Sequence, residues 1–107
     1  GMANREEKDI EIGTRFGRTC DPSVRDWFEE ALSKKIDCKI VVDKEFVGNV
    51  SLEAHRIGDS SGYSGYGNLY NAIQVEISRT LREKSRPELI KAFSDIILEF
   101  NSKFSNS

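Results

Sequence analysis

The sequence holds few of the residues that build metal sites or disulfide frameworks. Its 107 residues include two cysteines and one histidine. Cys20 and Cys38 fit neither a CxxC motif nor a zinc knuckle, so we expect two free thiols in a reducing compartment. A zinc site built wholly from one chain needs three or four ligands, which His55 and scattered carboxylates do not supply. The residues themselves therefore predict no metal site within this chain.

Long apolar runs and an excess of charge of one sign are also lacking. No stretch approaches the roughly 18–20 apolar residues that a membrane-spanning helix needs. No signal-peptide pattern is present, so we expect a cytoplasmic protein. The 16 basic side chains are nearly balanced by 18 acidic ones. This balance argues against a protein that binds nucleic acid or a membrane surface through bulk charge.

The length of the chain predicts one small domain. We interpret Gly1 before Met2 as a remnant of tag removal, and residues 1–8 as a disordered tail, which leaves 9–107 for the domain. The glycine- and serine-rich stretch 58–68 predicts a mobile loop. Its tyrosines, Tyr63 and Tyr66, either form a lid over a substrate or lie on the surface.

Apolar patterning predicts short strands separated by helices. Alternating isoleucines predict a strand over 9–13, and the β-branched run over 38–42 predicts a buried strand. The sequence VSLEAHRI over 50–57 predicts a second, weaker strand. Over 73–78 isoleucine and valine alternate with polar residues, which predicts a strand through about Ser78 and then a turn. An apolar repeat of four over 69–81 also fits a helix.

Capping residues predict two main helices. Asp21 and Pro22 are typical of a helix N-cap and first helical position, and the apolar spacing that follows predicts a helix to about Lys35. Ser85 and Glu88 form a capping-box pattern at the start of a long last helix. The order of elements favours an α/β fold with a small, largely parallel or mixed sheet of three to four strands.

One carboxylate, Glu76, interrupts the apolar run of the strand predicted near residue 75. On a strand, Gln74 and Glu76 share a face. A carboxylate buried there without a partner is costly. This face is therefore either solvated, ion-paired with Arg79 or another base, or part of a site.

Two motifs carry a resemblance to a known family. The stretch DIEIGTRFGRTCDPSV over 9–24, followed by YNAIQVEISRTL over 70–81, resembles in order and spacing the C-terminal half of the N-formylglutamate amidohydrolases. The resemblance covers roughly residues 9–83. It implies half of a phosphorylase/hydrolase-like fold similar to the zinc carboxypeptidases. It also implies hydrolysis of the amide of N-formyl-L-glutamate to glutamate and formate in histidine catabolism.

The resemblance further implies a zinc-dependent mechanism in which Glu76 is the general base and proton shuttle. The family's zinc ligands, two histidines and an acidic residue, lie in an N-terminal half that has no counterpart here. His55 does not correspond to any of them. Zinc is thus expected for the family, with its ligands absent from this chain, and we expect the isolated chain to be inactive.

Several polar residues are candidates for substrate binding. Arg15 and Arg18 lie in the turn before a helix N-terminus, where they are either solvated or hold a substrate carboxylate. Gln74 lies beside Glu76 on the predicted strand. Arg79 either pairs with Glu76 or another acid, or binds substrate. The implied substrate is a small anionic N-acyl amino acid.

The sequence leaves two functional hypotheses open. The first is an N-formylglutamate amidohydrolase-like enzyme or its C-terminal part, whether a fragment, a truncated gene product or one part of a two-chain enzyme. The second is a non-catalytic interaction or regulatory module derived from that fold. A sheet cut short leaves an edge strand that invites pairing with another chain, so the expected partners are a second copy or a complementing N-terminal half.

Overall fold

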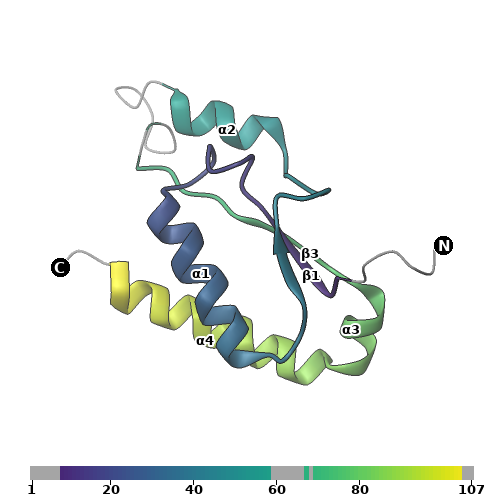
Figure 1. The fold of residues 1–107 in the computed structure, drawn as a ribbon. Helices are drawn as coiled ribbons and strands as arrows, with labels where there is room; N and C mark the ends of the chain where they lie inside the picture. Colours follow the sequence, from purple (N-terminus) through teal and green to yellow (C-terminus); the bar gives the residue numbers. More distant parts are fainter. Residues whose placement is uncertain (1–7, 59–66, 68, 105–107) are drawn as a thin grey trace.

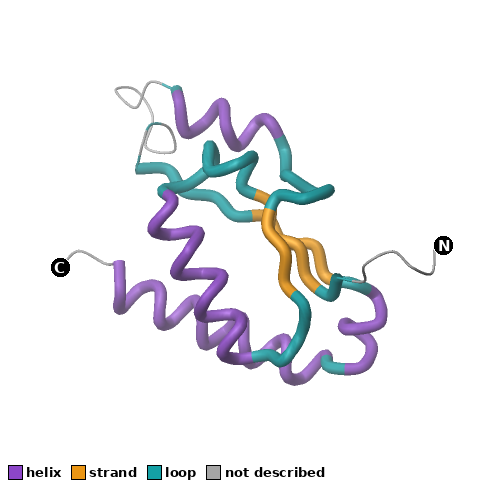
Figure 2. Tube along the Cα trace, in the orientation of Figure 1, coloured by secondary structure: helices purple, strands orange, loops and turns teal. Residues whose placement is uncertain are grey.

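The computed structural model describes residues 8–58, 67 and 69–104. It shows three strands at the centre and four helices around them (Figures 1 and 2). The N-terminal tail up to residue 7 and most of the predicted glycine-rich loop, including Tyr63 and Tyr66, lie outside the described residues. None of the helices in the described part is long and apolar enough to cross a membrane.

The sheet has β1 (Ile10–Gly13) in the middle, between β2 (Ile40–Val42) and β3 (Gln74–Ile77). Strands β1 and β2 are parallel, whereas β1 and β3 are antiparallel. The sheet is therefore mixed and three-stranded, within the predicted range of topologies. Every residue of β1 is buried because it has a strand on each side and other elements on both faces.

Helix α1 (Pro22–Lys35) begins and ends as its sequence predicts. The Asp21 side chain accepts a hydrogen bond from Ser23 N, and Pro22 occupies the first turn, where its missing N–H costs nothing. Lys34 and Lys35 lie in the last turn, where positive charge favours the C-terminal end of the helix dipole.

The predicted strand over 50–57 is wrong, because these residues form α2 (Val50–Ile57). The Asn49 side chain accepts a hydrogen bond from Ser51 N at 2.8 Å and caps the helix. The β-branched residues Val50 and Ile57 suggested a strand, but both are exposed at the ends of the helix. They contribute nothing to a packed sheet.

A helix also replaces the predicted turn after β3. The Ser78 side chain accepts a hydrogen bond from Leu81 N at 3.1 Å and caps α3 (Arg79–Lys84). The last helix, α4 (Arg86–Phe104), begins one residue after the predicted Ser85. Leu81 is buried, so α3 closes the end of the core at which β3 finishes.

One face of the sheet carries the apolar core. Helices α1 and α4 lie together on this face, while α2 lies at the other end of the sheet from α3 (Figure 1). The rings of Phe100 and Phe104 lie 5.9 and 5.6 Å from the Trp27 ring and extend the core between α1 and α4. The buried core residues are Ile10, Ala31, Leu32, Ile36, Leu81, Leu89, Ala92 and Ile96.

The opposite face of the sheet is polar. Because side chains alternate along a strand, Glu11 and Gly13 of β1 share this face with Gln74 and Glu76 of β3. The segment 43–49 crosses part of it, and α2 follows at the end where β1 finishes. This polar face holds the predicted site residues of β3.

Candidate functional site

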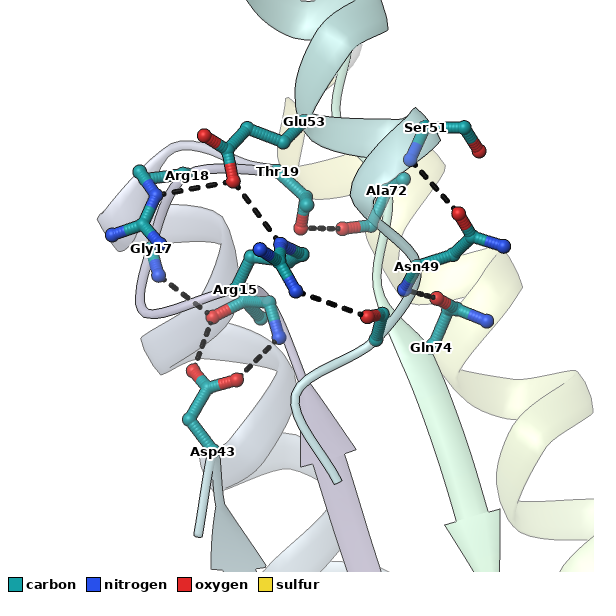
Figure 3. Close-up of polar contacts among 12 residues, drawn as sticks. Arg15, Gly17, Arg18, Thr19, Asp43, Asn49, Ser51, Glu53, Ala72 and Gln74 are labelled. Carbon is teal, nitrogen blue, oxygen red and sulfur yellow. Dashed lines mark hydrogen bonds and ion pairs between the residues drawn. The ribbon is translucent and has the colours of Figure 1, made fainter. Parts of the chain in front are cut away.

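A tightly bonded turn follows β1. Thr14 is fully buried. Its N–H and hydroxyl donate to the two carboxylate oxygens of Asp43 at 2.7 and 2.6 Å, and its hydroxyl accepts from Gly17 N at 3.0 Å (Figure 3). Arg15 and Phe16 have φ values of 50° and 60°, a conformation that is uncommon for residues with a side chain. The bonds around Thr14 hold the turn in this strained shape.

The turn presents both predicted arginines to one carboxylate. The Nε atoms of Arg15 and Arg18 each lie 3.1 Å from Oε1 of Glu53 on α2 (Figure 3). Hydrogen bonds from Arg15, and to a smaller extent from Arg18, hold the pKa of the Glu53 carboxyl below its ordinary value. The two guanidinium groups share this one carboxylate, and the Asp43 carboxylate binds the same turn.

Gln74 lies at the same end of the sheet. Its Oε1 accepts a hydrogen bond from Asn49 N at 2.5 Å, and Asn49 in turn caps the helix that carries Glu53. A side chain at Gly48 would place its Cβ 3.0 Å from Gln74 Oε1, and Gly48 has a φ of 98°. The turn before α2 therefore requires glycine at this position.

The turn before α2 packs directly on β1 through main-chain contacts. A Cβ at Gly13 would lie 2.8 Å from the carbonyl carbon of Val47, so only glycine fits there. Arg15 N donates to Val47 O at 2.8 Å. On the other side of the turn, Thr19 exchanges hydrogen bonds of 2.7 and 2.9 Å with the main chain of Ala72. These contacts fix Arg15, Arg18 and Gln74 relative to one another.

Glu76 lies on β3, as predicted, two residues beyond Gln74 and on the same face. Its side chain is exposed, and it has no hydrogen bond or ion pair with another described residue. The register places it directly opposite Glu11 of β1. Of the alternatives left open for this face, the ion pair with Arg79 is not formed among the described residues, and a solvated carboxylate and part of a site both remain.

Arg79 does not join the other predicted site residues. It lies on α3 beyond the far end of β3, and its side chain is 81% exposed. Its Nε lies 3.1 Å from Oε2 of Glu83, one helical turn further on. Arg79 therefore pairs with an acid other than Glu76, whereas Arg15, Arg18 and Gln74 are brought together.

Sequence reasoning missed the most deeply buried carboxylate, Glu11. It accepts hydrogen bonds from Lys8 Nζ at 2.6 Å, Lys44 N at 2.6 Å and Glu45 N at 2.7 Å. Burial raises the pKa of Glu11, but these bonds and one from Phe46 N outweigh it and lower the pKa to about 2. The alternation in DIEIG indicated a polar face, and nothing in the pattern showed that the segment after β2 covers it.

The remaining acids missed by sequence reasoning act as supports. Asp43 and Glu53 fix the turn and its arginines, and neither stands in a recognisable motif. Among the described residues no group of three or more histidine, cysteine, aspartate or glutamate side chains has a geometry that could hold a metal ion. These residues therefore do not fit a zinc site of their own.

No family model matches this chain, and comparisons with curated proteins and with solved structures also give no match. The resemblance to the N-formylglutamate amidohydrolases thus rests on the two motifs in the sequence.

Proposed function

We propose that this chain is the substrate-binding and proton-transferring part of an amide hydrolase similar to the N-formylglutamate amidohydrolases. The observation that carries the proposal is the common placement of Gln74 and Glu76 on the open face of β3, beside the arginine pair of Arg15 and Arg18. The described residues lack a zinc ligand set, so metal ligands would have to come from outside them.

The arginine pair supports recognition of a carboxylate. Glu53 engages the Nε atom of each guanidinium, and each group has further N–H donors at its terminal nitrogens. Arg18 is half exposed, with 50% of its side chain accessible. The exposed Arg18 group, with its remaining N–H donors, favours binding of a single carboxylate group in this place.

Glu76 supports the proton-transfer role through its position. Residues two apart on a strand lie about 6.6 Å apart along it, so Glu76 stands roughly one small-molecule length from the Gln74 end. A substrate carboxylate at the arginines would therefore place an N-acyl group near the Glu76 carboxylate. There the carboxylate can take a proton from water and deliver it to the leaving nitrogen.

A nuclear magnetic resonance titration tests the binding step. N-formyl-L-glutamate added at millimolar concentration is expected to shift the amide signals of residues 15–18 and Gln74. N-formyl-L-norvaline, which lacks the side-chain carboxylate, is the matched control ligand and is expected to bind more weakly. The double change Arg15→Gln with Arg18→Gln should remove the difference between the two ligands. Equal shifts by both ligands in the unchanged protein would refute the proposal.

An assay of formate release tests the chemistry. We expect none from the chain alone, with or without added zinc. Turnover that appears with zinc and survives Glu76→Gln would show that the assigned base is wrong.

The second candidate function, an interaction module, is favoured by a separate observation. Strand β3 has a strand on one side only among the described residues, and α4 beside it carries exposed isoleucines. Such a surface is typical of a site that pairs with another chain.

A further inference from the structure

The free edge of β3 offers main-chain hydrogen-bonding groups. Ser78 N donates to Asp9 O at 2.8 Å. Hydrogen-bonded pairs alternate along an antiparallel ladder. The main-chain groups of Glu76 therefore point toward Glu11 of β1, whereas the N–H and C=O of Val75 and Ile77 point away from β1. In agreement, the outward carbonyl of Ile77 accepts a hydrogen bond from Arg82 Nε at 3.3 Å.

Two apolar grooves lie near this edge, one between β3 and α4 and the other between α1, α4 and the segment just before β3. One, of about 380 Å³, is lined by Ile77, Arg82 and Ile90 among others. The other, of about 390 Å³, is lined by Trp27, Ile73, Ile97 and Phe100 among others. Ile90 and Ile97 are 62% and 61% exposed and lie two turns apart on α4. The edge and the helix stripe therefore form one surface, with hydrogen-bonding groups next to apolar side chains.

We propose that a second copy of this chain docks on this surface, with β3 of the two copies antiparallel about a twofold axis at Val75. A twofold interface requires a surface that is complementary to itself. Here Val75 of each copy faces its counterpart, Ile77 faces Ile73, and the exposed stripes of the two α4 helices lie on the same side of the joined sheet. Ile90, beside Ile77, then lies on the side of Ile97 of the other copy, which is beside Ile73.

The charges on β3 favour the register with the axis at Val75 over the register with the axis at Glu76. An axis at Glu76 would set two carboxylates directly opposite each other, which is destabilising. The axis at Val75 instead sets Glu76 opposite Gln74 of the second copy. Since the Oε1 atom of Gln74 accepts from Asn49 N, its NH₂ group is free to donate to the facing carboxylate. Glu76, which has no partner among the described residues, gains one in each half of the dimer.

Arg82 competes with the second copy. In this register the Ile77 carbonyl also accepts from Ile73 N of the other copy, on the edge where the Arg82 side chain now lies. Arg82→Ala is therefore expected to tighten the dimer severalfold.

Sedimentation equilibrium over a concentration series tests the inference. The expected particle has twice the 12.1 kDa mass of one chain at high concentration and dissociates on dilution. Ile97→Lys should raise the dissociation constant at least tenfold. Leu98→Lys is the matched control, because Leu98 is on the same helix, is 68% exposed and lines neither groove. It should leave the dimer unchanged, and circular dichroism should show both variants folded.

A charge exchange tests the register. Gln74→Glu keeps an acceptor for Asn49 N but sets a carboxylate opposite Glu76, so it should weaken the dimer. Adding Glu76→Gln to the same chain reverses donor and acceptor and should restore it. A monomer at all concentrations, a dimer indifferent to Ile97→Lys, or a failure of the double change to restore association would overturn the proposal. So would a monomer that binds a strand of a different protein along β3. These results are independent of the ligand titration at the arginines.

Discussion

Replacement of the buried carboxylate by an amide, Glu11→Gln, has a large expected effect on stability. Glu11 is fully buried and accepts three close hydrogen bonds, one of them from the Lys8 ammonium. Glutamine keeps the size of the side chain but has one acceptor oxygen instead of two. Its NH₂ group would face donors rather than acceptors. The N–H groups of Lys44 and Glu45 now share one carboxylate oxygen. A neutral amide oxygen accepts these two hydrogen bonds more weakly than a charged carboxylate does.

The pKa of Glu11 sets the magnitude. A pKa lowered from 4.5 to about 2 corresponds to about 3 kcal/mol of stabilisation when the carboxyl is ionised in both the folded and the unfolded chain. Because the folded pKa is the lower one, this stabilisation is complete above about pH 5 and is lost as the pH falls toward 2. Glu11→Gln is therefore expected to cost about 3 kcal/mol at neutral pH and little at pH 2.

Urea unfolding followed by Trp27 fluorescence, repeated between pH 7 and pH 2.5, measures the difference in free energy. Glu45→Gln is the control, since Glu45 also pairs with Lys8, at 3.0 Å, but its side chain is 77% exposed. An exposed pair of this kind contributes at most about 1 kcal/mol. Parallel stability curves for the wild type and Glu11→Gln across the acid range would refute the reasoning, because the cost would then not depend on ionisation.

Three further changes probe the turn after β1 and its supports. Thr14→Val leaves the half-buried Asp43 carboxylate and Gly17 N without their hydroxyl partner, and chemical denaturation should show a loss of about 1–3 kcal/mol. Gly48→Ala forces a side chain into a positive-φ position against Gln74, and the same measurement should show a loss of at least about 1 kcal/mol. Glu53→Gln removes the carboxylate between the arginines, so titration should show N-formyl-L-glutamate binding severalfold tighter at low salt, an increase that added salt reduces. Unchanged stability in the first two, or weaker binding in the third, would contradict these assignments.

The elements predicted correctly are those fixed by local chemistry. Helix α1 follows from Asp21 and Pro22, which determine the start of a helix whatever it packs against. Strands β1 and β3 follow from alternating β-branched residues. The error at α2 has a local cause, because Val50 and Ile57 favour extended structure while Asn49 favours a helix start. The cap decides the outcome, since none of the residues of α2 is buried.

The candidate site was predicted only in part, because its geometry depends on contacts between distant segments. The arginines were identified from their place before a helix N-terminus. Their common partner Glu53 was not, since it lies on the element that was assigned wrongly. The direction of β3 relative to β1 also decides which residues meet. An antiparallel β3 brings Gln74 to the arginine end and carries Arg79 to the opposite end.

The contact between Gly13 and Val47 couples the burial of Glu11 to the position of Gln74. The strip 43–49 carries the amide groups that cradle Glu11 near its beginning and the amide that anchors Gln74 near its end. At the crossing point the main chain of Val47 and Gly48 lies directly against Gly13 of β1. A methyl group added at Gly13 would displace the segment 43–49 from β1. Both Glu11 and Gln74 would then lose hydrogen bonds to this segment.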